Sequence, residues 1–184
     1  MKSVESLLRA FSNGDRQAAN EFIPLVYDEL RRIARLRRAN MNAWQSPGTT
    51  SLVHELYVHL AEQHGLEIRD RMQFLYLASV AIRNLVVDHA RYASRQKRGG
   101  AGVTEPLEDA AGPDANADRV LAIDESLNRL AAEDTRLCQI VECRFFGGLT
   151  VEETAEALEI SASSVKRGWD TARAWLYTQL RSSL

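Results

Sequence analysis

The chain lacks the features that define several protein classes. Among its 184 residues there are only two cysteines, Cys138 and Cys143, five positions apart and without a further Cys/His pair. That spacing matches neither a zinc site nor a disulfide framework, and it is typical of a reducing cytosol. No apolar run approaches the roughly 20 residues of a membrane span, and charged residues interrupt the N-terminus before a signal-peptide core can form. We therefore expect a cytoplasmic protein with no membrane insertion.

The motifs of common enzymes are also missing. The sequence contains no P-loop, no dinucleotide-binding fingerprint and no G-x-S-x-G elbow. His54 and Glu55 match the first two residues of the H-E-x-x-H zinc-protease motif, but the next histidine, His59, comes five positions after the first, whereas the motif needs four. We interpret His89, which lies on an apolar stripe, as a structural histidine. The sequence thus predicts no catalytic residue, no metal and no cofactor, and we expect that the protein is not an enzyme.

The sequence patterns that the chain does contain are those of helices. No run alternates with the period of a strand, and no Asn-Gly turn separates two apolar runs, so we expect an all-α protein. The longest helix is predicted over about residues 70–98. Its buried stripe is expected to contain Phe74, Ala78, Ala81, Leu85, His89 and Tyr92. Its opposite side is expected to carry Arg83, Asn84, Arg91, Arg95, Lys97 and Arg98.

One segment differs in composition from the rest. Residues 99–118 contain four glycines, two prolines, five acidic residues, no basic residue and no aromatic residue. Such a segment buries too little apolar surface to offset its ordering entropy. We therefore predict two small helical domains, residues 1–98 and 119–184, joined by a flexible acidic linker over residues 99–118. Two further helices are expected after the linker, before a break at Gly147 and Gly148. Their apolar positions are Val120, Ile123, Leu127 and Leu130 in the first helix and Leu137, Ile140, Val141 and Phe145 in the second.

The net charge of -2 conceals an uneven distribution. Residues 1–98 carry 15 Lys/Arg against 10 Asp/Glu, and residues 160–184 carry four against one. Between them, residues 119–159 carry four basic and nine acidic side chains. Two basic parts separated by acidic ones indicate two surfaces that meet a polyanion, although solvated helix faces would give the same pattern.

The strongest local pattern lies in residues 149–176. Thr150 and Glu153 form a capping box, a short turn around Glu159 follows, and Ser161 or Ser163 can cap a second helix. The inward stripe of that helix is expected to be Val165, Trp169, Ala172 and Leu176. The outward side near its start carries Ser163, Ser164, Lys166, Arg167, Asp170, Thr171 and Arg173. This is the pattern of a DNA-binding helix-turn-helix, and an ordinary helical hairpin is the other interpretation.

Two residues depart from that pattern. Glu159 stands where many such turns use glycine to reach a positive φ. Gly168 lies inside the second helix, where it either permits a close backbone approach or loosens the helix.

Three segments, in order, resemble those of a bacterial RNA polymerase sigma factor of the extracytoplasmic-function (ECF) type of the sigma-70 family. SLVHELYVHL (51–60) looks like the family's core-binding helix, and FLYLASVAIRNLVVDHARYASRQKRGG (74–100) looks like the helices that melt and read the promoter -10 element. LTVEETAEALEISASSVKRGWDTARAWL (149–176) looks like the domain that binds the -35 element. The resemblance implies a region 2-like domain over 1–98 and a region 4-like helix-turn-helix domain over 119–184.

The resemblance also implies roles for individual residues. The helix that docks on the clamp coiled coil of the largest polymerase subunit would use Leu52, Val53, Glu55, Leu56, Tyr57 and Leu60. Contacts to the -10 element would come from Arg83, Asn84, Asp88, Arg91, Arg95, Lys97 and Arg98. Contacts to the -35 element would come from Ser163, Ser164, Lys166, Arg167 and Arg173. Ser51 and His54 depart from the usual Asp and Gln, and Gly168 stands where a polar or acidic residue is common, which predicts weaker sequence readout there.

The sequence therefore predicts a sigma factor that binds core RNA polymerase and directs promoter-specific initiation. Its expected partners are core polymerase, promoter DNA and an anti-sigma factor or another regulator. A helix-turn-helix regulator that works without polymerase, with residues 1–98 as a dimerisation or sensor module, is the main alternative. A protein that only occupies the polymerase clamp is the third.

Overall fold

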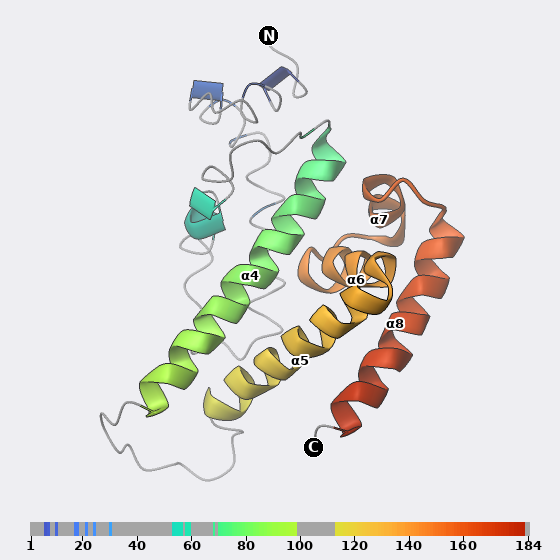
Figure 1. Ribbon diagram of the computed structural model, residues 1–184. Coiled ribbons are helices and arrows are strands. Elements are labelled where there is room, and N and C mark those ends of the chain that lie inside the picture. Colours follow the sequence, from blue (N-terminus) through green and yellow to red (C-terminus); the bar gives the residue numbers. More distant parts are fainter. Residues whose placement is uncertain are drawn as a thin grey trace.

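The computed structural model describes residues 71–98 and 113–182 throughout, and before them positions 6–7, 10, 17–18, 21, 24, 30, 53–56, 58–59, 68 and 70. Every regular element in this part of the chain is helical and no strand occurs in it, which confirms the all-α prediction. Figure 1 shows α5 (Pro113–Glu133) lying between α4 (Arg71–Arg98) and α8 (Ala162–Ser182). The segment after residue 112 therefore packs directly on the long helix that precedes it.

The helix α4 is buried on more than one side. It begins after Asp70, whose carboxylate accepts a hydrogen bond from the Gln73 N–H at 2.8 Å. Phe74, Ala78 and Ala81 of the predicted stripe are buried, but Tyr92 is 59 % exposed, so the stripe was wrong at its far end. The buried row turns instead through Ile82, Val86, Val87 and Ala90. The reason is that α4 contacts buried N-terminal positions as well as α5 and the elements that follow it.

The helix α5 begins inside the segment that we expected to be linker. Residues 113–118 are helical, and a proline suits the first helical position because its φ is preset and its missing N–H has no partner to lose. Leu127 and Leu130 are buried as expected, while Val120 and Ile123 are partly buried. The remaining residues of the expected linker, 99–112, lie outside the described part of the chain.

The next helix, α6 (Thr135–Val141), continues into a π-helical turn, η1 (Glu142–Phe146). The wide turn is closed by the Gly147 N–H, which donates to the Glu142 carbonyl at 2.9 Å. A π-helical turn holds more residues than an α-helical turn, so it changes which side chains face inward. We expected Phe145 in the core, but Phe145 is 38 % exposed and Phe146 is buried in its place.

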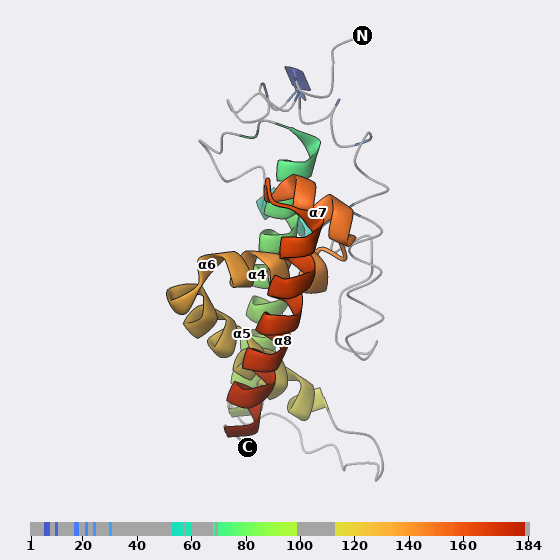
Figure 2. The same cartoon turned by 90° about the vertical axis from the view of Figure 1, so that its right-hand side faces the viewer.

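The last two helices are α7 (Val151–Ala157) and α8. The predicted capping box is present, with the Glu153 N–H donating to Thr150 Oγ1 and the Thr150 N–H donating to the Glu153 carboxylate. Glu159, in the turn that follows, has a φ of 55°, so a glutamate adopts here the positive φ for which many such turns use glycine. Both α6 and α7 pack against α8, and Figure 2 shows α7 at the upper end of α8 and α6 to its left.

Candidate nucleic-acid interface

The outward face of α8 presents positive charge to solvent. Lys166, Arg167 and Arg173 are exposed, and none of them forms an ion pair with another described residue. Ser163 is exposed beside them, and Ser164 is partly buried. The structure thus brings together all five residues that the sequence assigned to the -35 element, on or next to one helix face.

Three hydroxyl groups meet at the start of α8. Ser161 Oγ accepts a hydrogen bond from the Ser164 N–H at 3.1 Å, so Ser161 is the cap among the two candidates. The same oxygen lies 2.9 Å from Ser163 Oγ and 2.8 Å from Ser164 Oγ. A helix N-terminus carries partial positive charge, and hydroxyl groups there can donate to phosphate oxygens.

The inner side of α8 fixes its position on the rest of the fold. Val165 and Ala172 are fully buried, and Trp169 is partly buried with the Arg144 guanidinium 5.7 Å from its ring centroid. Nearer the C-terminus, the indole N–H of Trp175 donates to a carboxylate oxygen of Glu133 at 3.0 Å. Contacts on both α5 and α6 therefore hold the outward face in a defined orientation.

Gly168 belongs to this inner side. A Cβ at this position would lie 2.5 Å from Cδ1 of Ile140 and 3.3 Å from Cδ2 of Leu137, both on α6. The glycine therefore permits a close approach between α8 and α6, which was one of the two interpretations of its place in the sequence. The expectation that Gly168 weakens sequence readout loses its basis, because this position faces α6 and not the outward side of α8.

The long helix α4 carries the residues assigned to the -10 element, but they do not share one environment. Asn84, Asp88, Arg91 and Arg95 are exposed, whereas Arg83 is only 6 % exposed. The expectation that Arg83 lies on the exposed side of the helix was therefore wrong for this conformation. The side chains of Lys97 and Arg98 lie outside the described part of the chain. The role of the whole set at the -10 element stays a prediction.

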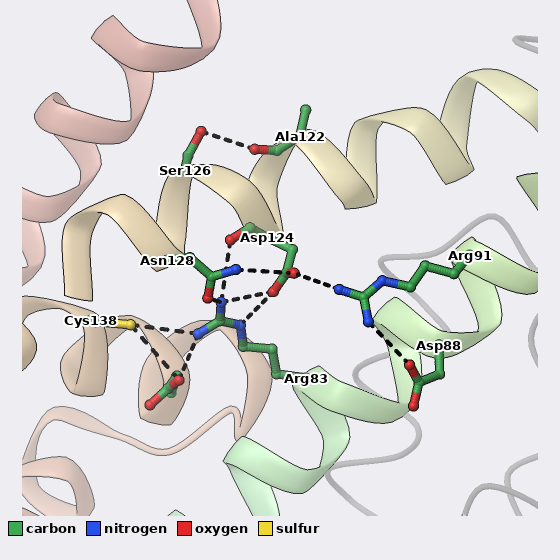
Figure 3. A network of polar contacts seen from close by, with 9 residues as sticks. Arg83, Asp88, Arg91, Ala122, Asp124, Ser126, Asn128 and Cys138 are labelled. Atoms are coloured by element: carbon green, nitrogen blue, oxygen red, sulfur yellow. Dashed lines mark hydrogen bonds and ion pairs between the residues drawn. The ribbon is translucent and has the colours of Figure 1, made fainter. Parts of the chain in front are cut away.

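Arg83 is the centre of a polar network between α4 and the second half of the chain (Figure 3). Its guanidinium forms ion pairs with Asp124 of α5 at 2.7 Å and with Glu142 of η1 at 2.8 Å. Burial disfavours the charged guanidinium, but the hydrogen bonds to the two carboxylates outweigh it and raise the pKa of Arg83 above its ordinary value. Cys138 Sγ lies 3.6 Å from Nη1 of the same side chain. Burial, followed by the charge of Glu142, raises the pKa of Cys138 to about 11 and that of Cys143 to about 12.

The segment assigned to core polymerase is only partly described, since Leu52, Tyr57 and Leu60 lie outside the described residues. Val53 and Leu56 are 5 % and 0 % exposed and belong to the hydrophobic core that contains Phe74. They cannot contact a partner in this conformation, and the reason is that their apolar stripe packs within the protein. The Glu55 carboxylate lies 2.8 Å from Nε2 of His89, so it joins this segment to α4.

Sequence reasoning missed the partners of Arg83. Asp124, Asn128 and Glu142 lie 41, 45 and 59 positions further along the chain, so no local spacing connects them with Arg83. The available signal was the charge distribution, because the acidic residues 119–159 complement the basic residues 1–98. Thr154, on α7, was also unexpected in the core, where its hydroxyl is buried without a hydrogen-bond partner.

The described residues offer little support for other classes of site. No three or more of their His, Cys, Asp and Glu side chains are placed to hold a metal ion. None of the described helices combines the length and the apolar character that crossing a bilayer requires.

Comparison with known proteins identifies the family of the chain. No match is found among curated proteins or among solved structures. The family model described as "ECF sigma factor" matches residues 1–182. Members of that family are regulatory DNA-binding proteins, not enzymes, and act with core RNA polymerase on promoter DNA. Because the match covers the basic helix α4, the acidic segment and the cationic face of α8 together, the chain belongs to the ECF sigma factor family and serves promoter-directed transcription.

Proposed function

We propose that the outward face of α8 binds the -35 element of a promoter, and that α4 holds the opened -10 element, while the chain is bound to core RNA polymerase. The observation that carries this proposal is the set of exposed cations on α8, Lys166, Arg167 and Arg173, none of which pairs with a carboxylate in the described part of the chain. They follow the serine hydroxyls at the helix start, and the inner side of the same helix is fixed by packing on α6 and α5.

An α-helix with its side chains is about 10–12 Å across, so the first turns of α8 fit the width of a major groove. Ser163 and Arg173 are ten residues apart on one helix, which is about 15 Å at 1.5 Å per residue. The major groove of B-DNA is about 12 Å wide and admits an α-helix whose first turns contact base edges. Lysine and arginine at these positions can bind phosphates or the acceptor edge of guanine.

The exposed side of α4 suits single-stranded DNA. Asn84 and Arg91 are exposed, and Tyr92, which we expected to be buried, is 59 % exposed. An aromatic ring can stack on an unpaired base, while cations hold the backbone of the strand. The three side chains therefore fit the proposed contact with an opened -10 element.

The binding of core polymerase requires a surface on the segment around residues 53–59 other than its buried stripe. His54 is exposed, and Val58, four positions later, is 37 % exposed, so both lie on the outer side of this helical segment. We assign the polymerase contact to this outer side, which explains how Val53 and Leu56 can remain in the core. The contact with the clamp coiled coil, like any regulator such as an anti-sigma factor, stays a prediction.

The α8 assignment is tested with Lys166→Ala and Arg167→Ala, with Arg181→Ala as the matched control. Arg181 is exposed on the last turn of the same helix, about 20 Å from the first two positions. Binding of the holoenzyme to a duplex promoter is measured at several salt concentrations. Each of the first two variants should weaken binding and reduce the salt slope by about one, while the control should leave both unchanged. Equal effects in all three variants would contradict the assignment.

The polymerase assignment is tested with Val58→Asp and Leu56→Asp, measured by affinity for core polymerase and by circular dichroism. Val58→Asp should lower the affinity with the helical signal intact, because the side chain lies at the surface. Leu56→Asp should unfold the chain, since it places a charge in the core. Unchanged polymerase affinity in a folded Val58→Asp variant would show that this outer side is not the contact.

A further inference from the structure

The helix α8 contains a single acidic residue, Asp170, among four basic ones. Asp170 is exposed, four positions after Lys166 and three before Arg173. Side chains at these separations are neighbours on a helix, and opposite charges there commonly pair. Within the described part of the chain, however, no ion pair joins Asp170 to these cations or to another side chain. Its carboxylate is therefore available to a ligand that approaches this face.

Asp170 lies at the middle of the outward face, opposite the buried side of α8. Successive residues of a helix are rotated by about 100°, so Asp170 is about 140° from Val165 and about 160° from Ala172. Both of these side chains are fully buried. Between them, the backbone of α8 approaches α6 closely at Gly168, where an added Cβ would lie 2.5 Å from Cδ1 of Ile140. Packing on the inner side thus directs the Asp170 side chain away from the core.

A carboxylate at this place favours some DNA sequences over others. An ionised carboxylate accepts hydrogen bonds and donates none, and the phosphates of DNA repel it. In the major groove the available donors are the N4 amino group of cytosine and the N6 amino group of adenine. The adenine amino group lies between two acceptors, its own N7 and O4 of the paired thymine, whereas the cytosine amino group has one such neighbour, O6 of the paired guanine. Cytosine is therefore the better partner for a carboxylate.

We propose that Asp170 is a specificity-determining residue, which accepts a hydrogen bond from N4 of a cytosine and thereby makes α8 select a C·G pair at one position of the -35 element. This inference rests on the proposed function of α8. Lys166 and Arg167 precede Asp170 by about 6 and 4.5 Å along the helix axis, and base pairs are stacked about 3.4 Å apart. The selected pair thus lies one or two base pairs from those that these cations reach. Repulsion by the phosphates lowers the affinity for sequences that lack the cytosine.

The proposal is tested by the DNA sequences that the holoenzyme selects. Core polymerase with the full-length chain is incubated with duplexes of a promoter found by run-off transcription, in which the -35 element is randomised, and the bound duplexes are sequenced. Asp170→Ala removes the acceptor, whereas Asp170→Asn keeps the size of the side chain and adds a donor. The charge control is Glu125→Ala, because Glu125 is exposed on α5 and its ion pair is with Arg129 of the same helix.

The wild-type holoenzyme should enrich cytosine about tenfold over the other bases at one position of the element. Asp170→Ala should reduce this enrichment to within about twofold of the other bases. Asp170→Asn should shift the preference to adenine, because its N6 and N7 match the donor and acceptor of an asparagine amide. Glu125→Ala should select cytosine as the wild type does. A cytosine preference that is absent from the wild type, or that survives in Asp170→Ala, refutes the proposal.

Two further results separate this inference from its alternatives. If Asp170→Ala binds every duplex more tightly by the same factor and the base preferences are unchanged, Asp170 only repels phosphates and the inference is wrong. If Lys166→Ala and Arg167→Ala bind weakly while the Asp170 variants select the wild-type bases, the proposed function of α8 stands and the inference alone fails. If all of these variants bind and select as the wild type does, α8 is not the DNA-binding face and both proposals fail.

Discussion

The replacement Gly168→Ala sets helix propensity against packing. At an exposed position inside a helix, alanine is more favourable than glycine by about 1 kcal/mol. Gly168 is buried, and the added Cβ would lie 2.5 Å from Cδ1 of Ile140 and 3.3 Å from Cδ2 of Leu137. Ile140 is 1 % exposed, so its methyl group can move only by displacing other core atoms. Overpacking of this kind costs about 1–3 kcal/mol, and we expect a net destabilisation of about 1 kcal/mol.

A double-mutant cycle isolates this contact. Ile140→Val removes Cδ1 and alone should cost about 1 kcal/mol. In the double variant the alanine Cβ occupies the space that Cδ1 has left. The stabilisation from the higher helix propensity of alanine then offsets the free energy lost with the methyl group of Ile140. The free energy of unfolding should then be close to the wild-type value, which corresponds to a coupling of about 2 kcal/mol between the two sites.

The assay is urea unfolding followed by circular dichroism, with the slope against urea required to stay constant across the four proteins. If Gly168→Ala alone stabilises the chain by about 1 kcal/mol, α8 does not pack on α6 as described. Holoenzyme formed with folded Gly168→Ala should bind duplex promoter DNA as tightly as holoenzyme formed with the wild-type chain, because the residue faces α6. A loss of DNA affinity without a loss of stability would place Gly168 on the DNA side instead.

Three further outcomes follow from single features of the structure. Glu159→Gly should raise the free energy of unfolding by about 0.5–1 kcal/mol, because glycine adopts a φ of 55° without strain; an unchanged urea midpoint would contradict this. Thr154→Val should stabilise by about 1 kcal/mol by removing a buried unpaired hydroxyl, and a lower melting temperature would show that the hydroxyl is satisfied. Burial raises the pKa values of the Cys138 and Cys143 thiols from 9.0 to about 11 and 12. Above pH 9 the unfolded chain loses these protons first, so the free energy of unfolding should be highest below pH 9 and should decrease as the pH rises above it. A constant urea midpoint between about pH 9 and 11 would refute the burial of these thiols.

The end of the chain was the most predictable part because its signals are local. The capping box needs only Thr150 and Glu153, three positions apart, and the inner side of α8 follows from helical spacing of Val165 and Ala172. Glu159 was interpreted as a departure from the motif because many such turns use glycine, but its φ of 55° shows that it adopts the conformation for which glycine is used. These features depend on neighbours within one or two turns, which is the range that a periodic pattern reports.

The long helix α4 was harder to predict because it packs on several elements at once. One apolar stripe describes a helix that meets a single layer, whereas α4 also meets α5 and η1. The spacing of Arg83 among basic residues indicated a solvated side, but its carboxylate partners come from residues far along the chain. Val53 and Leu56 were assigned to a partner contact but are buried, because a family motif identifies a helix without showing which of its sides faces the core.

The prediction that Phe145 is buried was wrong for a different reason. Helical spacing assumes a constant number of residues per turn, and the π-helical turn at Glu142–Phe146 breaks that assumption. The exchange of Phe145 for Phe146 in the core follows directly from this change. The -10 and -35 contacts themselves stay predictions until they are measured on DNA.

The central claim, that this chain brings core RNA polymerase to promoters, is tested most directly by run-off transcription. Core polymerase is mixed with the purified chain and with DNA fragments from the source genome, and the 5′ ends of the transcripts are mapped. We expect new, discrete start sites that appear only when the chain is added and that weaken when Lys166 and Arg167 are both replaced by alanine. Transcripts that are identical with and without the chain would contradict it.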